Sequence, residues 1–451
     1  MRKFFGTDGI RGRVGEYPMS ADFFLRLGWA VGRVLVPGGG GNVIIGKDTR
    51  SSGYMFESAL EAGFSAAGVS VQLLGPLPTP AIAYLTRSTD ASAGVVISAS
   101  HNPFYDNGIK FFSADGKKLA DETEAAIEQQ ISMSFETVES ANLGYAERME
   151  DAADRYVEFC KASLADGDSI SGIKAVLDCA NGAAYSIGPR VLRELGAELY
   201  AVAVQPDGLN INHNCGSTHL EMIKNELQQH SGAIGIALDG DADRVLMIDE
   251  NGHVVDGDEL LFIIARARQS RNSLVGPVVG TVMTNLGIEN AFKEAGLTFA
   301  RAPVGDRNVL AKLDELGGQL GGEASGHIIC LDRTTTGDGL IAAIQVLAEM
   351  KARGCRLVDL CSDLHKYPQR LVNVQVRELF QPDSSPDLEK EIAAAEAELS
   401  NSGRVVLRAS GTESLIRVMV EGKDEKQVVK LAERLAEAVR RTAESRSRAT
   451  G

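Results

Sequence analysis

Long hydrophobic runs are missing from this chain of 451 residues. No apolar stretch approaches the roughly 20 residues that cross a bilayer. The start, MRKFFGTDGIRG, also lacks the roughly 7–15 apolar residues of a secretory signal. The six cysteines include no C-x-x-C pair, so their spacing argues against a zinc site or a disulfide framework. We therefore expect a cytoplasmic protein with reduced thiols and no membrane contact.

Positive charge is in deficit, with 46 lysines and arginines against 61 aspartates and glutamates, which gives a formal net charge of −15. This balance argues against nucleic acid or an anionic membrane surface as a partner. A site for an anionic small molecule would have to gather its own cations. The length suggests three or four domains.

Short β-branched runs alternate with helical patterns along most of the chain, which is typical of an α/β fold with largely parallel sheets. Strands are expected at 42–46, 94–98, 174–178, 233–238 and 277–282. Helices are expected at 219–230, 307–316 and 339–353. Strands at 370–376, 404–409 and 416–421 and a helix at 424–441 predict a small C-terminal α+β domain, which ends in a frayed tail.

Three changes of pattern suggest domain boundaries: a polar stretch at 134–154, a turn at 249–253 and the segment 366–368. The predicted domains are 1–152, 153–252, 253–366 and 367–451. Ligands of open α/β sheets bind at the carboxyl ends of the strands. The polar loops that follow the predicted strands are therefore expected to converge on one central cleft between domains.

The segment VVISASHNPFYDNGIK at 95–110 carries the first candidate site residue. A buried strand runs into small and polar residues, which predicts that Ser100 lies in an exposed turn with His101 beside it. A serine in such a turn is more often a cap than a nucleophile. The catalytic interpretation is favoured because other polar loops also follow predicted strands and are expected to lie near this turn.

The segment DGDADR at 239–244 separates two predicted strands. On extended backbone, alternate residues point the same way, so Asp239, Asp241 and Asp243 can present three carboxylates to one cation. Oxygen ligands select Mg²⁺ or Ca²⁺. An EF-hand is excluded because Arg244 stands where that loop needs glycine and because strands flank the segment.

Three basic residues lie in or beside these loops: Arg11, Lys110 and Arg244. A magnesium ion with three carboxylates is still anionic, and a phosphoserine would add about −1.5 to −2 charges. An anionic substrate would need neighbouring cations in such a site. The three basic residues are therefore candidate charge-stabilising groups.

Two further loops carry candidate binding residues. In GGEASGH at 321–327, Glu323 and Ser325 occupy alternate positions that suit paired sugar hydroxyls, although a turn role explains them equally well. In RASGTESLIR at 408–417, backbone N–H groups of the loop can form an anion nest and arginines can add charge-assisted bonds. The candidate residues of this second loop are Arg408, Ser410, Gly411, Thr412 and Arg417.

Taken together, the segments resemble the α-D-phosphohexomutase superfamily along the whole chain. The motifs that carry the resemblance are FGTDGIRG at 5–12, SASHNP at 98–103, DGDADR at 239–244, GEASGH at 322–327 and RASGTE at 408–413. Their order and spacing match the superfamily, whose architecture is four domains around a central cleft, three of them related α/β units. The FGTDGIRG start and the NPFYDNGIKFF extension look like a bacterial branch that acts on glucosamine phosphates. Ala409 and Ser414 depart from this branch, which usually has proline there.

The resemblance implies a role for each candidate residue. Ser100 would be the phosphoserine, and its phosphate would join Asp239, Asp241 and Asp243 around Mg²⁺. His101, Lys110 and His327 would be acid/base or charge-stabilising groups whose division of labour stays open. Glu323 and Ser325 would contact sugar hydroxyls, and the 408–417 loop would hold the phosphate that does not react.

The implied reaction interconverts glucosamine 6-phosphate and glucosamine 1-phosphate through a 1,6-bisphosphate, and it would feed the synthesis of UDP-N-acetylglucosamine and cell-wall precursors. Glucose or glucosamine 1,6-bisphosphate would be an activator, and the protein would be a monomer or homodimer whose C-terminal domain rotates over the cleft. The alternatives are a mutase for glucose or mannose phosphates, a magnesium phosphatase and a non-catalytic sugar-phosphate binding protein.

Overall fold

The computed structural model describes residues 3–6, 8–377, 380–409 and 414–449. The chain forms two compact units. The first unit comprises Met1–Val279 and Gly305–Ser362, and the second comprises Gly280–Val304 and Asp363–Gly451. Within the described ranges, every helix is too short or too polar to cross a membrane.

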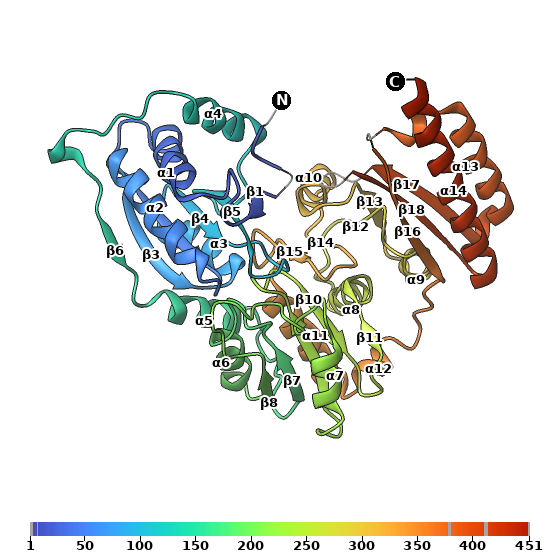
Figure 1. The fold of residues 1–451 in the computed structure, drawn as a ribbon. Helices are drawn as coiled ribbons and strands as arrows, with labels where there is room; N and C mark the ends of the chain where they lie inside the picture. The colour runs from blue at the N-terminus through green and yellow to red at the C-terminus, as the bar shows by residue number, and fades with distance from the viewer. Residues whose placement is uncertain (1–2, 7, 378–379, 410–413, 450–451) are drawn as a thin grey trace. The chain divides into compact units, whose positions relative to one another are not determined.

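The first unit begins with a mixed six-stranded sheet (Figure 1). Its order is β1 (Ile10–Arg13), β5 (Asp106–Ser113), β4 (Ala93–Ile97), β2 (Asn42–Lys47), β3 (Ser70–Pro76) and β6 (Ala146–Arg148). The strands β2, β3, β4 and β6 are parallel, and β5 is antiparallel to both of its neighbours. The associated helices are α1 (Ala21–Leu35), α2 (Ser52–Ala66), α3 (Thr79–Ser88), α4 (Asp121–Ile131) and the short η1 (Ser140–Asn142).

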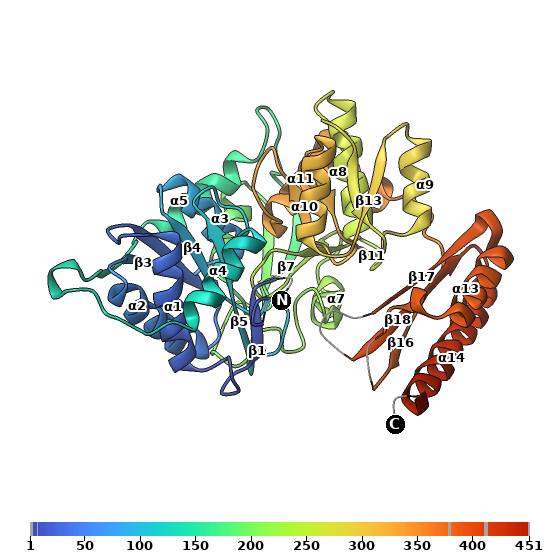
Figure 2. The same cartoon turned by 90° about the horizontal axis from the view of Figure 1, so that it is seen from above.

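Helices cover both faces of this sheet (Figure 2). Val43 and Ile45 of β2 belong to the apolar core that also contains residues of α1 and α2. Gly46, which points to the other face, would place a Cβ 2.6 Å from the Ile82 side chain of α3. Successive strand residues alternate between faces, so a continuous apolar run is what a strand buried on both sides requires.

The second sheet of this unit has five strands. Its order is β11 (Val254–Val255), β10 (Val245–Ile248), β9 (Ile234–Leu238), β7 (Lys174–Asp178) and β8 (Glu198–Val202), with the helices α5 (Ala152–Ala162), α6 (Ile187–Glu194) and α7 (Glu221–Leu227). The strands β9 and β10 are antiparallel, so the loop that joins them is a hairpin.

A third sheet has four strands in the order β13 (Phe299–Ala302), β12 (Val278–Thr281), β14 (Leu320–Gly322) and β15 (Ile328–Cys330). Its helices are α8 (Gly257–Ser270), α10 (Asp306–Leu316), α11 (Gly339–Arg353) and α12 (Leu357–Leu360). The Asp256 side chain caps the start of α8, and Gly354 ends α11 with a left-handed φ of 60°. The chain passes from the first unit to the second within β12, at Gly280.

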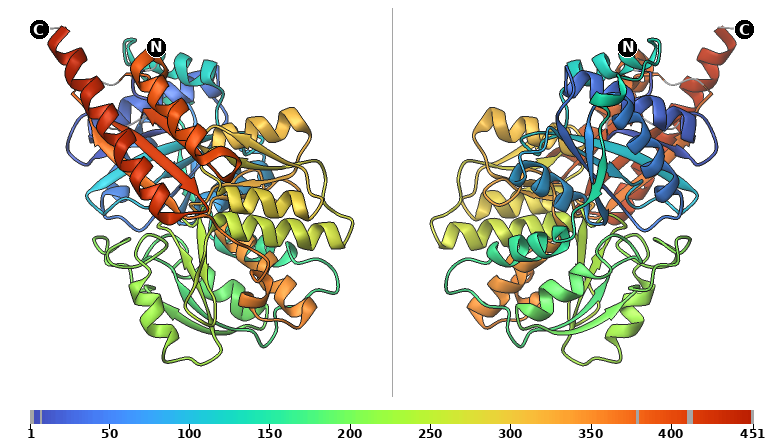
Figure 3. Two further views of the ribbon diagram at one scale, coloured as in Figure 1. Left: turned by 90° about the vertical axis from the view of Figure 1, so that its right-hand side faces the viewer. Right: turned by 90° about the vertical axis from the view of Figure 1, so that its left-hand side faces the viewer.

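In the second unit, α13 and α14 lie side by side on one face of a three-stranded antiparallel sheet (Figures 1 and 3). Its elements are α9 (Leu286–Glu294), β13 (Phe299–Ala302), β16 (Gln369–Gln375), η2 (Pro382–Ser384), α13 (Pro386–Leu399), η3 (Ser400–Ser402), β17 (Gly403–Ala409), β18 (Leu415–Gly422) and α14 (Glu425–Ala449). The sheet order is β16-β18-β17. Apolar residues of α14 at helical spacing, such as Leu431 and Leu435, are fully buried against this sheet.

The predicted α/β class with a smaller α+β C-terminal part is confirmed. The predicted end of the last helix at residue 441 is wrong, because α14 continues to Ala449. The tail contains good helix formers and neither glycine nor proline before Gly451, so nothing in its sequence stops the helix. The predicted helix at 219–230 is shorter in the structure, where α7 spans Glu221–Leu227.

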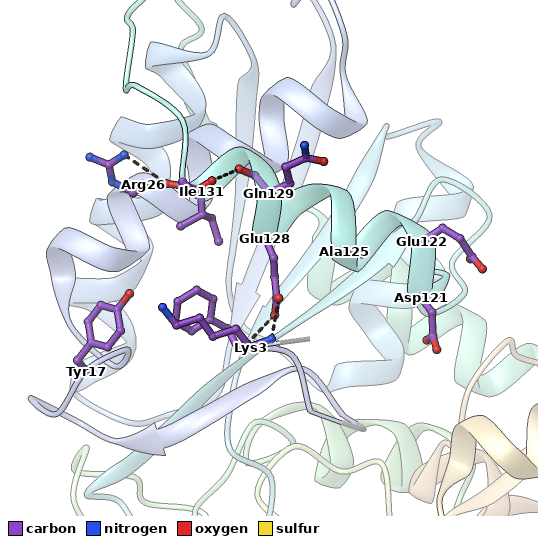
Figure 4. A pocket seen from close by; sticks show the side chains of 11 residues that line it. Lys3, Tyr17, Arg26, Asp121, Glu122, Ala125, Glu128, Gln129 and Ile131 are labelled. Atoms are coloured by element: carbon purple, nitrogen blue, oxygen red, sulfur yellow. Dashed lines mark hydrogen bonds between the residues drawn. The ribbon is translucent and has the colours of Figure 1, made fainter. Parts of the chain in front are cut away.

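A hollow of about 820 Å³ lies between α4 and the N-terminal segment (Figure 4). The carboxylate of Glu128 projects toward it and accepts hydrogen bonds from the backbone N–H groups of Lys3, Phe4 and Phe5. Arg26 donates to the carbonyl oxygens of Ile131 and Met133. Glu128 thus holds the N-terminal segment and Arg26 holds the end of α4, and none of the candidate site residues lines the hollow.

Candidate active site

Ser100 follows β4 in a tight turn and has a left-handed φ of 52°. Its hydroxyl donates to Asp239 Oδ2 at 2.6 Å, and its backbone N–H donates to Ser98 Oγ at 2.9 Å. The prediction of an exposed turn is wrong, because Ser100 is fully buried. The 239–244 loop covers it, since Asp239 accepts from its hydroxyl and a Cβ on Gly240 would lie 2.6 Å from its carbonyl oxygen. Residues 139 or more positions away in the chain are not visible in the local sequence around Ser100.

The three aspartates of the β9–β10 hairpin converge. Asp239, Asp241 and Asp243 each offer an oxygen within 4.8 Å of the others, and all three are buried. The predicted extended backbone is wrong, since the Ala242 N–H donates to the Asp239 carbonyl at 3.1 Å and Ala242 has a φ of 57°. A tight turn, rather than strand alternation, therefore brings the carboxylates together.

This cluster fits a divalent cation. Within the described part of the chain, no group donates a hydrogen bond to Asp241 Oδ1 or Asp243 Oδ1, although both atoms are buried. Burial and the neighbouring charges of Asp243 and Asp241 raise the pKa of Asp239 well above its usual range. A cation among the three carboxylates would reverse that shift. The all-oxygen donor set is the one that hard cations prefer.

We expect Mg²⁺ to raise the melting temperature of the protein, because a ligand that binds only the folded chain adds about 2.7 kcal/mol of stability at 100 times its Kd. Asp243→Asn should abolish most of the increase, which differential scanning calorimetry measures. Asp178→Asn is the control, because Asp178 is a buried strand-end aspartate of the same sheet that accepts from Ala180 N and Gly216 N. An equal response in both variants would contradict the site.

Lys110 of β5 neutralises part of the cluster. Its Nζ lies 3.0 Å from Asp241 Oδ2, 3.4 Å from Asp243 Oδ2 and 3.3 Å from Asp8 Oδ2. Burial opposes its charge, but the surrounding carboxylates outweigh burial and raise the pKa of the ammonium group. Lys110 is therefore a buried, permanently charged cation.

His101 is neutral at pH 7, because burial and the Arg244 guanidinium lower its pKa to about 4. Arg244 Nη1 lies 3.4 Å from His101 Nδ1. A guanidinium can only donate, so this contact requires Nδ1 to be the acceptor. The Ser100 hydroxyl also lies 3.4 Å from the same nitrogen.

His327 follows the turn after β14 and is buried between two carboxylates. Its Nδ1 lies 3.6 Å from Asp243 Oδ2, and its Nε2 lies 3.7 Å from Asp306 Oδ2. Burial disfavours its charged form, but Asp243 outweighs burial and raises the pKa of the imidazole. The two histidines thus have opposite pKa shifts within one site.

Sequence reasoning missed three charged residues of this site: Asp8, Lys118 and Asp306. Asp8 pairs with Arg11 and Lys118, and Lys118 also pairs with Asp306. The structure thus places Arg11 beside the cluster through Asp8. Asp8 lies inside the FGTDGIRG motif, which was the available signal. Lys118 and Asp306 lie in no motif, and a single charged residue in a sequence normally indicates a surface position.

Glu323 and Ser325 lie in the tight turn between β14 and β15, where Gly326 N donates to the Glu323 carbonyl at 2.9 Å. Glu323 Oε1 accepts from the backbone N–H of Gly305 at 2.9 Å. Ser325 is exposed. Glu323 is therefore held in place by the neighbouring loop, whereas Ser325 is accessible.

The remaining candidates belong to the second unit. Arg408 of β17 and Arg417 of β18 are cross-strand partners in the antiparallel register. Ser410, Gly411 and Thr412 lie outside the described residues.

Four sequence models of one family match the chain. Their descriptions are phosphoglucomutase/phosphomannomutase alpha/beta/alpha domain I at residues 2–137, domain II at 154–252, domain III at 256–367 and the C-terminal domain at 371–438. The matches follow the order of the domains along the chain and together cover most of it.

The chain is also similar to curated proteins along nearly its whole length. A phosphoglucosamine mutase of Methylococcus capsulatus is 58% identical, and the match covers 98% of this chain and 99% of that protein. A phosphoglucosamine mutase of Thioalkalivibrio sulfidiphilus is 57% identical with the same coverage. Among solved structures, a phosphoglucomutase/phosphomannomutase family protein of Burkholderia thailandensis has a TM-score of 0.82 and 25% identity, and covers 98% of this chain and 99% of that one.

Proposed function

Because the chain belongs to the phosphoglucomutase/phosphomannomutase family, we propose that it interconverts glucosamine 6-phosphate and glucosamine 1-phosphate through a phosphoserine. The observation that supports this most directly is the 2.6 Å hydrogen bond from the Ser100 hydroxyl to Asp239 Oδ2, within the three-aspartate cluster. A serine at a magnesium site of this kind can carry a phosphoryl group close to a charge-neutralising ion.

The proposed step conserves one phosphoryl group. In the forward half, the bond between phosphorus and Ser100 Oγ breaks, a bond to a sugar hydroxyl oxygen forms, and the hydroxyl proton passes to a base. The product is a 1,6-bisphosphate, which turns end for end. In the second half, its other phosphate returns to Ser100 Oγ, and the departing sugar oxygen takes up a proton.

We assign the metal to Asp239, Asp241 and Asp243, together with the Ser100 phosphate. A bound Mg²⁺ would supply charge neutralisation on the phosphoryl oxygens. Lys110 would hold the carboxylates of Asp241 and Asp243 and add positive charge beside the transferred group. Arg244 and Arg11 would contribute further positive charge.

The histidines would divide the acid and base work according to their surroundings. His101 has a lowered pKa of about 4 and lies 3.4 Å from Ser100 Oγ, so at neutral pH it is in the unprotonated form that a base requires, although the low pKa makes it a weak one. His327 has a raised pKa and can donate one. Lys110 stays charged and would act by its field. This division goes beyond the sequence, which left it open.

The proposed substrate-binding residues lie in two loops. Glu323 and Ser325 would accept and donate hydrogen bonds to sugar hydroxyls. Arg408 and Arg417, with Ser410, Gly411 and Thr412, would hold the phosphate that is not transferred. Since each end of the bisphosphate occupies this place in turn, the loop must accept two orientations.

Other parts of the proposal rest on the sequence alone. They are the domain boundaries 1–152, 153–252, 253–366 and 367–451, the phosphorylation of Ser100, and activation by glucose or glucosamine 1,6-bisphosphate. The cytoplasmic location, the monomeric or homodimeric state and the rotation of the C-terminal domain over a central cleft also remain predictions.

Rates with two substrates test the proposal. With Mg²⁺ and a trace of 1,6-bisphosphate, we expect kcat/KM for glucosamine 1-phosphate to exceed that for glucose 1-phosphate by at least about tenfold. The reason is that a site whose acceptors match an ammonium group makes charge-assisted hydrogen bonds to it, and these become weaker bonds with the hydroxyl sugar. A preference for glucose or mannose phosphates would overturn the glucosamine assignment, and steady release of inorganic phosphate would indicate a phosphatase.

A further inference from the structure

The main chain of Ser100 is held in a conformation that serine seldom adopts. Its φ of 52° lies in the left-handed region, where residues other than glycine, asparagine and aspartate are disfavoured. Such a conformation persists only where the surrounding structure fixes it. The Ser98 hydroxyl accepts from the Ser100 N–H, and other side chains bind the Ser100 carbonyl oxygen.

Two buried side chains share the carbonyl oxygens of the turn. Asn212 Nδ2 donates to the carbonyl oxygens of Ser100 and Asn102, both at 2.9 Å. Arg50 Nη2 donates to the same two oxygens, at 3.3 Å for Ser100. Each carbonyl therefore accepts from both donors. We call Asn212 and Arg50 the carbonyl clamp.

The clamp residues are themselves fixed. Asn212 has a φ of 57°, which asparagine tolerates, and its backbone N–H donates to the Ala180 carbonyl at 2.9 Å. Arg50 forms an ion pair with Asp48, and both side chains are fully buried. Asp48 also accepts from the Arg50 backbone N–H at 2.9 Å.

In the 239–244 loop, which carries the three aspartates, the absence of a side chain at Gly240 leaves space for the carbonyl clamp. A Cβ on Gly240 would lie 2.6 Å from the Ser100 carbonyl oxygen and 2.8 Å from Asn212 Nδ2. Those distances exclude any side chain, so Gly240 permits the Asn212 amide to reach Ser100. Since Gly240 separates Asp239 from Asp241, the same short loop carries two metal-cluster carboxylates and borders the clamp.

We infer that Asn212 and Arg50 are positioning residues that hold Ser100 Oγ toward the metal cluster throughout the reaction cycle. This inference rests on the proposed function. The bonds to Oγ change in every turnover, and phosphorylation adds about −1.5 to −2 charges to it. The carbonyl oxygen takes no part in the reaction. The hydrogen bonds of the carbonyl clamp can therefore stay the same whether Ser100 is free or phosphorylated.

Two variants of Asn212 separate its amide from its backbone conformation. Asn212→Gly keeps a residue that accepts positive φ and removes both donors, whereas Asn212→Asp keeps the shape and sets a carboxylate against two carbonyls. We expect each to lower kcat by about 10- to 100-fold, since a displacement of about 1 Å of a reacting group can cost this much. KM should change by less than about threefold, because Asn212 is not assigned to substrate binding.

The ³¹P signal of the phosphoserine supplies a readout that general destabilisation would not move. We expect its chemical shift and linewidth to change in both variants, recorded well below the melting temperature of each variant in Mg²⁺. The control is Asn214→Gly. Asn214 also has a left-handed φ, of 54°, but it is exposed and its amide contacts His213.

Wild-type kcat and an unchanged ³¹P signal in both Asn212 variants would overturn the inference. The outcome is distinguishable from failure of the proposed function itself. If Ser100→Ala is inactive and the Asn212 variants are normal, only the clamp is refuted. If Ser100→Ala retains mutase activity, the phosphoserine reaction is refuted, whatever the Asn212 variants do.

Discussion

Ser100→Ala is expected to lower the mutase kcat by about 10⁴-fold or more, because the reaction then lacks the atom that receives and returns the phosphoryl group. The variant should still bind Mg²⁺, since the three carboxylates remain. Intact-mass analysis should find one covalent phosphate on the wild-type protein and none on the variant, and peptide mapping should locate it at Ser100.

Ser98→Ala is the matched comparison for this variant. Ser98 is equally buried, and its hydroxyl accepts from the Ser100 N–H and also forms a hydrogen bond with the Asp48 carboxyl group. We expect a much smaller loss of kcat, on the order of tenfold, with the covalent phosphate retained. If Ser100→Ala kept more than about one hundredth of the wild-type activity, or if the phosphate mapped elsewhere, Ser100 would not be the phosphoryl carrier.

Lys110→Met is expected to have the second largest effect, and to affect stability as well as rate. Without the ammonium group, Asp8, Asp241 and Asp243 lose a cation that lies within 3.4 Å of each. Removing one partner of a buried ion pair typically costs about 3–5 kcal/mol. In a chelator, the melting temperature should therefore fall, and kcat in Mg²⁺ should fall by about 10²-fold or more.

Saturating Mg²⁺ should restore part of the lost stability of Lys110→Met, because both cations neutralise the same carboxylates. The increase in melting temperature on adding Mg²⁺ should consequently be larger in the variant than in the wild type. Lys117→Met, which alters an exposed lysine of the adjacent turn, controls for the change of net charge. Equal increases in all three proteins would contradict the shared role of Lys110 and the metal.

Elements with a strong local pattern were predicted closely from the sequence. The helix expected at 339–353 is α11 (Gly339–Arg353), because Asp338 caps its start and Gly354 ends it. The strand expected at 174–178 is β7, because its apolar run fills a buried strand between two neighbours. Helix α14 was underestimated, because its last residues lack an apolar face while still favouring helix.

The site was predictable where a motif concentrates one chemistry. The three aspartates predict a cation site because three carboxylates occur within five residues. Lys118 and Asn212 were not predictable, because each acts on a partner distant in the chain. Lys118 binds Asp8 across 110 positions, and Asn212 binds Ser100 across 112. A residue in a loop reveals its partner only after the fold has brought them together.

The buried contacts around Ser100 also decide which pieces of the chain can be separated. Ser100 comes from the first sheet, its aspartates come from the second, and His327 comes from the third. Thr79 of α3 donates to Asp241 Oδ2 at 2.6 Å and so joins the first two. A fragment that ends before residue 150 would expose a nucleophile without its carboxylates. Grafting the serine turn onto another scaffold would therefore transfer its backbone conformation without the carboxylates and the histidine on which the proposed reaction depends.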